Sequence, residues 1–187
     1  LAAAAEDLSA PGQGKPYGGS VIHLGSISKT LVPALRIGWV AAATPVIAAL
    51  TRAKVGADIA TSALTQLVTY ELLNDGFEDE HVGEIRAFYR ARRDAMLEAL
   101  AREMPKDFSW TRPEGGLFIW VTGPPDVSVA ALFEAAMKRG VGFVKGAAFY
   151  ADFISDNNFR LNYSNADPGR IAEGIGRLAA AIADVRR

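Results

Sequence analysis

The segment 78–104, EDEHVGEIRAFYRARRDAMLEALAREM, constrains the fold more than any other part of the sequence. Its apolar residues recur at close to helical spacing along the whole span: Val82, Ile85, Phe88, Tyr89, Met96, Leu97 and Leu100. A helix of this length extends about 37 Å, which is enough to bridge two lobes. The segment therefore predicts a linking helix, with a domain boundary inside or near it. Its charge run, residues 86–96, is typical of a solvated helix face.

The residues before this helix alternate between short apolar runs and polar loops. Residues 9–20 are rich in Gly, Pro and Ser and predict a loop. Two short strands follow in SVIHL (20–24) and RIGWVAAA (36–43), with a polar loop between them. Thr44 and Pro45 suit the start of a helix that runs to about Gly56, and a second helix fits 61–75.

The residues after the linking helix form a second alternating set. The predicted strands lie in FSWTRPEGGLFIWVTG (108–123), VGFVKG (141–146) and NFRLNYS (158–164). Helices are predicted for SVAALFEAAMKRG (128–140) and, beginning at Asp167 and Pro168, for the C-terminus. Strands and helices on both sides of the linking helix predict a mixed α/β chain.

The composition excludes several classes of function. The 187 residues contain no cysteine, which excludes disulfides, thiolate metal sites and a cysteine nucleophile, and is compatible with a cytoplasmic location. The formal net charge of -1 gives no basic footprint for nucleic acid. His23 and His81 stand alone, so we predict no metal site. The longest apolar stretch, 39–50, is too short to span a membrane.

A lysine in the first polar loop carries the main chemical signal. The stretch GSISKTLVPALRIGW (25–39) places Lys29 in this loop, with an arginine seven residues further on. A phosphate-binding loop of the Walker type is the first candidate, but Ser28 and His23 stand where that motif needs glycine. Formation of a Schiff base is the better match, because it uses a single lysine with a neutral amine near a cationic neighbour. Arg36 supplies that cation.

The same loop can hold an anion beside the lysine. The Arg36 guanidinium and the hydroxyls of Ser26 and Ser28 are groups that bind phosphate oxygens. One lysine, two serines and one arginine within eleven residues can thus hold a phosphorylated aldehyde at both ends.

SISKTLVPALRIGW resembles the S-x-S-K-x-x-x-P-x-x-R-x-G signature of class I/II aminotransferases, which are fold-type I enzymes that use pyridoxal 5'-phosphate (PLP). It looks most like the 2-aminoadipate and kynurenine-type transaminases and the aminotransferase-like domains of MocR regulators. The resemblance implies that Lys29 bonds covalently to PLP, while Ser26, Ser28 and Arg36 hold its phosphate. Ala34 stands where family members often have glycine.

The resemblance extends over most of the chain and implies its fold. The segments 112–121, 140–150 and 157–164 look like strands of the family's small domain. We therefore expect residues 1–85 to be the C-terminal portion of the cofactor-binding large domain, a mixed sheet with helices. Residues 86–187 are expected to be the α+β C-terminal small domain.

Arg160 is the expected ligand of the substrate α-carboxylate. An arginine inside an apolar and aromatic strand is costly to bury unless a carboxylate pairs with it. The guanidinium fork suits a carboxylate because it can donate two parallel hydrogen bonds. The structural alternative is an internal ion pair with Asp156 or Asp167.

The resemblance implies an aminotransferase that moves an amino group between an amino acid and a 2-oxo acid, acting as a homodimer. Two other functions remain open: the effector domain of a MocR/GntR-type regulator with an N-terminal DNA-binding segment, and a non-enzymatic scaffold. The resemblance covers only about half of a family chain of about 400 residues. We therefore expect the chain to be a C-terminal fragment that is inactive alone.

Overall fold

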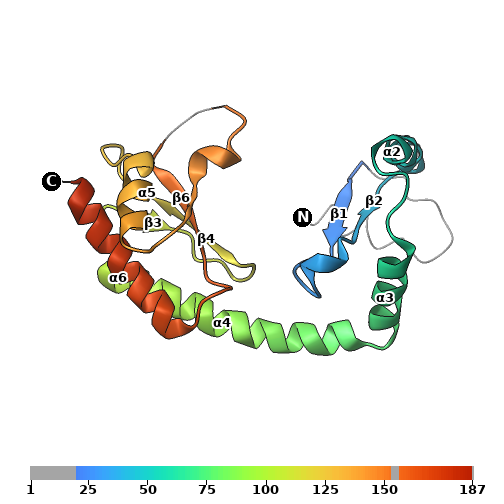
Figure 1. Ribbon diagram of the computed structural model, residues 1–187, viewed down its shortest axis with the longest axis horizontal. Helices are drawn as coiled ribbons and strands as arrows, with labels where there is room; N and C mark the ends of the chain where they lie inside the picture. The colour runs from blue at the N-terminus through green and yellow to red at the C-terminus, as the bar shows by residue number, and fades with distance from the viewer. Residues whose placement is uncertain (1–19, 153–155, 187) are drawn as a thin grey trace. The chain divides into compact units, whose positions relative to one another are not determined.

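The computed structural model describes residues 20–152 and 156–186 (Figure 1). Most of the predicted loop at 9–20 lies outside these residues. The chain divides between Glu84 and Ile85 into two compact units, here called the N-terminal unit and the C-terminal unit. The division falls within helix α4 (Phe77–Glu103), which the sequence predicts to within one residue at each end. The assignment of the two units to the family's large and small domains stays a prediction.

The N-terminal unit is built on a β-hairpin. Strand β1 (His23–Ser26) pairs antiparallel with β2 (Gly38–Ala41), so that Gly25 lies opposite Trp39. The hairpin is tightly packed at this pair, because a Cβ on Gly25 would lie 2.0 Å from Cε2 of Trp39. The connection between the strands contains a turn at 27–30 and the 3-10 helix η1 (Pro33–Leu35).

Two helices complete this unit. Helix α2 (Thr44–Ala57) has proline in its first turn, as predicted, although its N-cap is Ala43 and not Thr44. Helix α3 (Ala63–Asn74) follows, with Ser62 at its N-cap position but without a side-chain capping bond. Most large apolar side chains of α3 are exposed, and among the described residues of the unit only Ile27, Ala42 and Thr69 are buried.

A four-stranded antiparallel sheet forms the centre of the C-terminal unit. The spatial order is β3 (Ser109–Trp110), β4 (Phe118–Thr122), β6 (Asn158–Asn162) and β5 (Val144–Lys145). The predicted strand at 141–146 is wrong in its extent, because only two residues pair with β6 and the 3-10 helix η2 (Gly146–Phe149) follows directly. A Cβ on Gly146 would lie 2.6 Å from the Asn158 backbone oxygen, so glycine is needed at this bend.

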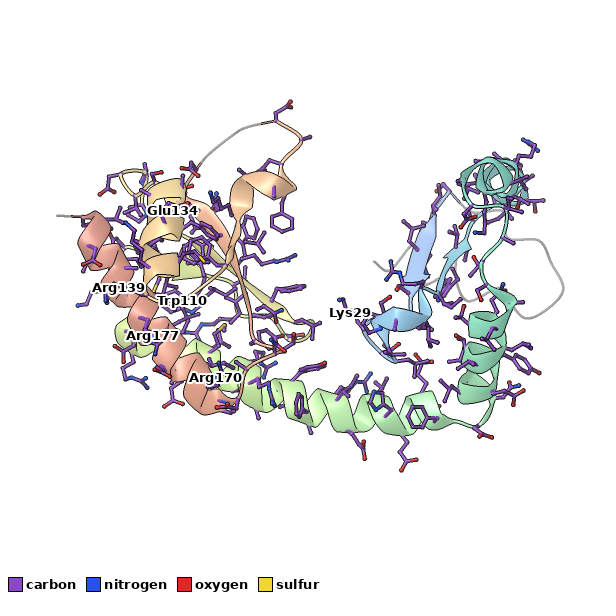
Figure 2. All side chains as sticks on the ribbon, in the orientation of Figure 1. Lys29, Trp110, Glu134, Arg139, Arg170 and Arg177 are labelled. Carbon is purple, nitrogen blue, oxygen red and sulfur yellow. The ribbon has the colours of Figure 1, made fainter. Side chains whose placement is uncertain are left out.

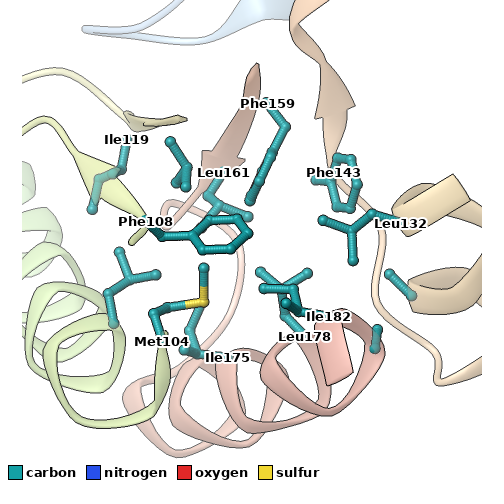
Figure 3. Close-up of a cluster of buried hydrophobic side chains, with 14 of the residues drawn as sticks. Met104, Phe108, Ile119, Leu132, Phe143, Phe159, Leu161, Ile175, Leu178 and Ile182 are labelled. Atoms are coloured by element: carbon teal, nitrogen blue, oxygen red, sulfur yellow. The ribbon is translucent and has the colours of Figure 1, made fainter. Parts of the chain in front are cut away.

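Helices α4, α5 (Val129–Lys138) and α6 (Pro168–Val185) cover one face of this sheet (Figure 3). Strand alternation selects the buried side chains: Ile119 and Val121 of β4, with Phe159 and Leu161 of β6, join the core. The intervening residues of both strands, among them Trp120 and Arg160, therefore lie on the other face. This second face carries the predicted carboxylate-binding residue.

Side chains at the helix starts fix where α5 and α6 begin. The Ser128 hydroxyl accepts the N–H of Ala131, and Asp156 accepts from the Ser128 hydroxyl at 2.8 Å. Asp167 accepts the N–H of Arg170 at 3.0 Å, and Pro168 occupies the first turn of α6, as the sequence predicts. The caps satisfy backbone N–H groups in the first turns of the two helices.

The part of the chain that the structure describes contains neither a candidate membrane-spanning helix nor a candidate metal-binding cluster. No helix there combines the length and apolar character needed to cross a membrane. No group of three His, Cys, Asp or Glu side chains there could hold a metal ion.

Candidate active site

Lys29 stands in the turn that follows β1 (Figure 2). Its neighbour Ile27 is buried, and the N–H of Leu31 donates to the Ile27 oxygen at 2.8 Å, which closes the turn. The Lys29 side chain is exposed. The buried isoleucine therefore anchors the turn while the lysine remains accessible.

The two predicted phosphate-binding serines, Ser26 and Ser28, are joined by a hydrogen bond. The N–H of Ser28 donates to Oγ of Ser26 at 3.2 Å. The Ser26 hydroxyl in turn donates to the backbone oxygen of Ile37 at 3.5 Å. Ile37 follows Arg36 directly, on the opposite side of the hairpin. The hairpin thus brings Ser26 and Ser28 together and links them to the backbone beside Arg36.

Arg36 has an uncommon backbone conformation. It caps η1 with φ 55° and ψ 37°, in the left-handed region, and its N–H donates to the Pro33 oxygen at 3.3 Å. Its guanidinium Nη1 also donates to Pro33, at 3.1 Å. Such a conformation in a residue other than glycine costs about 1–2 kcal/mol. Strained backbone of this kind is found preferentially at functional sites.

The cations of this loop have no acidic partner among the residues that the structure describes. No carboxylate among residues 20–152 and 156–186 forms an ion pair with Lys29 or Arg36, and both side chains are exposed. An ammonium, a guanidinium and two serine hydroxyls are suited to an anion and to a carbonyl carbon. The donor set therefore fits PLP, whose phosphate and aldehyde need these groups.

Arg160 lies on the strand face opposite the helices, in register with Trp120 of β4 and Val144 of β5. Its guanidinium carbon is 3.8 Å from the ring centre of Phe118 and 4.7 Å from that of Phe149. The side chain is partly buried. Aromatic rings thus surround the predicted carboxylate ligand.

The internal ion pairs considered for Arg160 do not form. Asp156 instead accepts hydrogen bonds from the Ser128 hydroxyl and, at 3.4 Å, from the N–H of Ala130. Asp167 caps α6, and this hydrogen bond to the Arg170 N–H is the main cause that lowers its pKa. No ion pair of Arg160 is found in the described part of the chain. Its guanidinium fork, which meets no acid within 20–152 and 156–186, can bind an external anion.

Sequence reasoning missed the residues that fix the Glu114-Gly115-Gly116 turn. The Tyr163 hydroxyl donates to the Gly116 oxygen at 2.6 Å, and burial raises the pKa of this phenol. The Arg93 guanidinium donates to the oxygens of Pro113 and Glu114, each at 3.2 Å. These contacts hold the turn that leads directly into Phe118. The arginines in 86–96 are therefore not all solvated, contrary to expectation.

Phe118 and Phe149 are the other residues that the pattern did not reveal. The strand alternation at 118–122 could have placed Phe118 on the same side as Trp120. Its contact with Arg160 depends on the pairing of β4 with β6, and the contact with Phe149 depends on η2. Lys29 belongs to the N-terminal unit and Arg160 to the C-terminal unit.

The family model for aminotransferase class I and II matches residues 5–178, and the chain belongs to this family. The chain is 42% identical over 164 residues to aromatic-amino-acid aminotransferase 1 of Thermococcus litoralis, covering 88% of this chain and 39% of that protein. It is 43% identical over 162 residues to the 2-aminoadipate transaminase of Thermus thermophilus, covering 87% and 41%.

A solved structure agrees with the sequence matches. The α-aminoadipate aminotransferase LysN of Thermus thermophilus, crystallised with N-(5'-phosphopyridoxyl)-L-leucine, superposes with a TM-score of 0.85 at 41% identity. The match covers 92% of this chain and 43% of that one. The chain therefore spans less than half the length of these relatives. The fold is that of part of a PLP-dependent aminotransferase, as the resemblance implied.

Transcriptional regulators also match, at lower identity. The HTH-type regulator YdfD of Bacillus subtilis, itself uncharacterized, is 33% identical over 167 residues, which covers 89% of this chain and 34% of the regulator. The aminotransferase matches are closer in sequence and the solved structure is an enzyme, so the enzyme interpretation is the better supported of the two.

Proposed function

We propose that the protein carrying this sequence is a PLP-dependent aminotransferase, which moves an amino group between an amino acid and a 2-oxo acid. The family membership and the relatives support this proposal. The observation that carries it is the loop itself, which presents Lys29, Arg36 and two serine hydroxyls without any acidic partner among the described residues.

The family indicates PLP as the cofactor, in agreement with the phosphopyridoxyl compound bound by the solved relative. When bound, PLP supplies an aldehyde and a pyridine ring that withdraws electrons from the substrate Cα. Within the proposal, residues 1–85 are part of the large, cofactor-binding domain and 86–187 form the small domain.

Each proposed site residue has a separate task. The Nζ of Lys29 would hold the cofactor at its aldehyde, and as a free amine it would accept the proton of the substrate Cα. Ser26, Ser28 and Arg36 bind the phosphate. Arg160 binds the substrate α-carboxylate through its guanidinium fork.

Lys29 can serve as both covalent anchor and base because its position combines a fixed backbone with a free side chain. The turn is anchored by buried Ile27 and closed by the 2.8 Å hydrogen bond from Leu31. The long lysine side chain is exposed, so its Nζ would be able to reorient between these two tasks. A fixed turn backbone and a mobile Nζ therefore suit both the anchoring of the cofactor and the transfer of the proton.

Turnover is the test of this proposal. Purified protein containing the whole reading frame is incubated with PLP, an amino acid and 2-oxoglutarate, and the new amino acid is measured. Lys29→Ala should lower turnover by about 10³-fold or more, because it removes both nucleophile and base. Lys106→Ala, at an exposed lysine of the C-terminal unit, is the matched control and should leave turnover unchanged. Equal rates in the two variants would refute the role of Lys29.

The similarity to YdfD favours one further candidate, a regulator that binds the cofactor without turning over amino acids. Reading the start of the full reading frame separates the two, because the regulator needs a DNA-binding segment there. A homodimer and a cytoplasmic location are also proposed, and sedimentation equilibrium together with cell fractionation tests them.

A further inference from the structure

The surroundings of Arg160 contain more than the arginine itself. Phe118 comes from β4 and Phe149 from η2, so two different elements each bring a ring face to the guanidinium, at 3.8 and 4.7 Å. Phe118 lies opposite Asn162 in the β4–β6 register, diagonal to Arg160 on the same face of the sheet. The Phe118 contact is therefore set by strand pairing.

A guanidinium that stacks on aromatic rings keeps its hydrogen-bonding edge free. Stacking uses the flat faces of the group, whereas its N–H donors lie in the plane. Within the described residues, Arg160 has no hydrogen-bond acceptor and no acidic partner. By contrast, Arg139 and Arg186 each pair with a carboxylate. Arg160 thus differs from those arginines in having two aromatic rings and, among the described residues, no acid beside it.

Phe149 is itself held in place by neighbouring aromatic residues. Trp120 makes an edge contact with Phe149 at 5.5 Å between ring centres and another with Tyr150 at 6.2 Å. The Tyr150 hydroxyl accepts a hydrogen bond from Asn158, a buried residue of β6. This chain of contacts connects η2 to the sheet and fixes the ring that faces Arg160.

We propose that Phe118 and Phe149 are positioning residues that orient the Arg160 guanidinium, so that its free edge meets the substrate α-carboxylate. This inference rests on the proposed function and adds to it two residues that act through Arg160. The rings limit rotation of the guanidinium, which lowers the entropy lost when a carboxylate binds. They also stabilise the cation without occupying its donors.

The test measures carboxylate binding at Arg160 in the 187-residue chain without cofactor. The ¹⁵N–¹H signal of Arg160 Nε is assigned by its loss in Arg160→Lys, and propionate is titrated as the probe. The signal should shift saturably in the wild-type chain. Phe118→Leu and Phe149→Leu should each weaken propionate binding about three- to tenfold, the range expected for loss of one cation–π contact. Phe118→Tyr, which keeps a ring, should restore it to within about twofold of wild type.

Phe88→Leu is the matched control, because Phe88 stacks on Arg92 at 3.4 Å but has no contact with Arg160. It should leave propionate binding unchanged. Thermal unfolding of every variant separates a structural defect from a positioning defect: the inference requires weaker binding in variants whose melting temperature matches that of Phe88→Leu.

The possible failures are distinguishable. If propionate does not shift the Arg160 Nε signal of the wild-type chain, Arg160 is not the carboxylate ligand and this part of the proposed function is wrong. If the wild-type signal shifts saturably but Phe118→Leu and Phe149→Leu bind propionate with wild-type affinity, the arginine keeps its role and the positioning inference is overturned. In turnover assays of the cofactor-loaded protein, the two leucine variants should raise KM for the amino acid with kcat changed less than about twofold.

Discussion

The two units of this chain bury their apolar side chains to very different extents. In the C-terminal unit, α6 places Ile171, Ile175 and Leu178 in the core, each with 3% exposure or less. In the N-terminal unit, α3 is similarly rich in apolar residues but exposes Leu64, Leu67 and Tyr70 by 70%, 61% and 59%. A helix that is apolar on most sides normally needs cover on most sides. The described residues of the N-terminal unit do not supply that cover.

This difference explains why the surroundings of Arg160 differ from those of Lys29 and Arg36. Arg160 belongs to the unit with a closed core, and its aromatic frame is complete within that unit. Lys29 and Arg36 belong to the unit with little buried surface, and both are exposed. The aminotransferases that match this chain are more than twice as long as the matched region. We propose that the cofactor loop needs such additional protein around it.

The largest effect that tests this comparison is the loss of a core side chain. Phe159→Ala should destabilise the C-terminal unit by about 3–5 kcal/mol, because Phe159 is fully buried between the sheet and the helices. Leu67→Ala on α3 should change stability by less than about 0.5 kcal/mol. Urea unfolding followed by circular dichroism measures both. A cost of several kcal/mol for Leu67→Ala would show that α3 is packed in the isolated chain.

A smaller effect is expected from glycine substitutions within the N-terminal unit. Gly25→Ala places a Cβ 2.0 Å from the Trp39 indole and should cost about 1–3 kcal/mol. Gly56→Ala in α2 meets nothing within 4 Å and should stabilise by about 0.5–1 kcal/mol. Fluorescence of Trp39 in a Trp110→Phe, Trp120→Phe background reports the unfolding of this unit. If both variants behave alike, the hairpin is not packed as described.

Removing the Tyr163 hydroxyl should have a moderate effect in the C-terminal unit. Tyr163→Phe leaves the Gly116 oxygen without its 2.6 Å partner and should cost about 1 kcal/mol. The turn it holds contains Gly116 at φ 82°, a conformation that only glycine adopts easily. Hydrogen exchange at Leu117 and Phe118 should accelerate in this variant. Unchanged exchange would mean that Arg93 alone fixes the turn.

The smallest expected effect concerns pH. The hydrogen bond from Arg186 lowers the pKa of Asp107 in the folded chain. A lowered folded-state pKa contributes stability above the unfolded pKa, about 3.9, which is lost as the pH falls through the folded value. Asp107→Asn should therefore lower the free energy of unfolding near pH 7, where the carboxylate contributes stability, and should reduce the further loss of stability below about pH 4. An identical acid profile for wild type and variant would contradict this assignment.

Local patterns predicted the elements of the fold well where one periodicity dominates. The linking helix expected at 78–104 is α4, and the start of α6 at Asp167 and Pro168 is confirmed. The strand expected at 141–146 is only two residues long, because the chain bends at Gly146 and continues as η2. Such a bend depends on close approach to Asn158, twelve residues away, which no local pattern records.

The candidate site was predictable in its residue types but not in its environment. The spacing of Ser26, Ser28, Lys29 and Arg36 pointed to a phosphorylated aldehyde, and these roles stay predictions. The left-handed backbone of Arg36 has no sequence signal, because glycine is the residue expected there. The rings on Arg160 come from Phe118 and Phe149, which are distant in sequence and meet it only through the sheet register and η2.

The covalent bond between Lys29 and the cofactor is the central claim, and borohydride trapping tests it most directly. The protein is incubated with an equimolar amount of PLP, reduced with sodium borohydride, digested, and analysed by mass spectrometry. We predict that the phosphopyridoxyl label is found on Lys29 and is lost in Lys29→Arg. A label spread evenly over Lys54, Lys106, Lys138 and other lysines, with none enriched at Lys29, would contradict it.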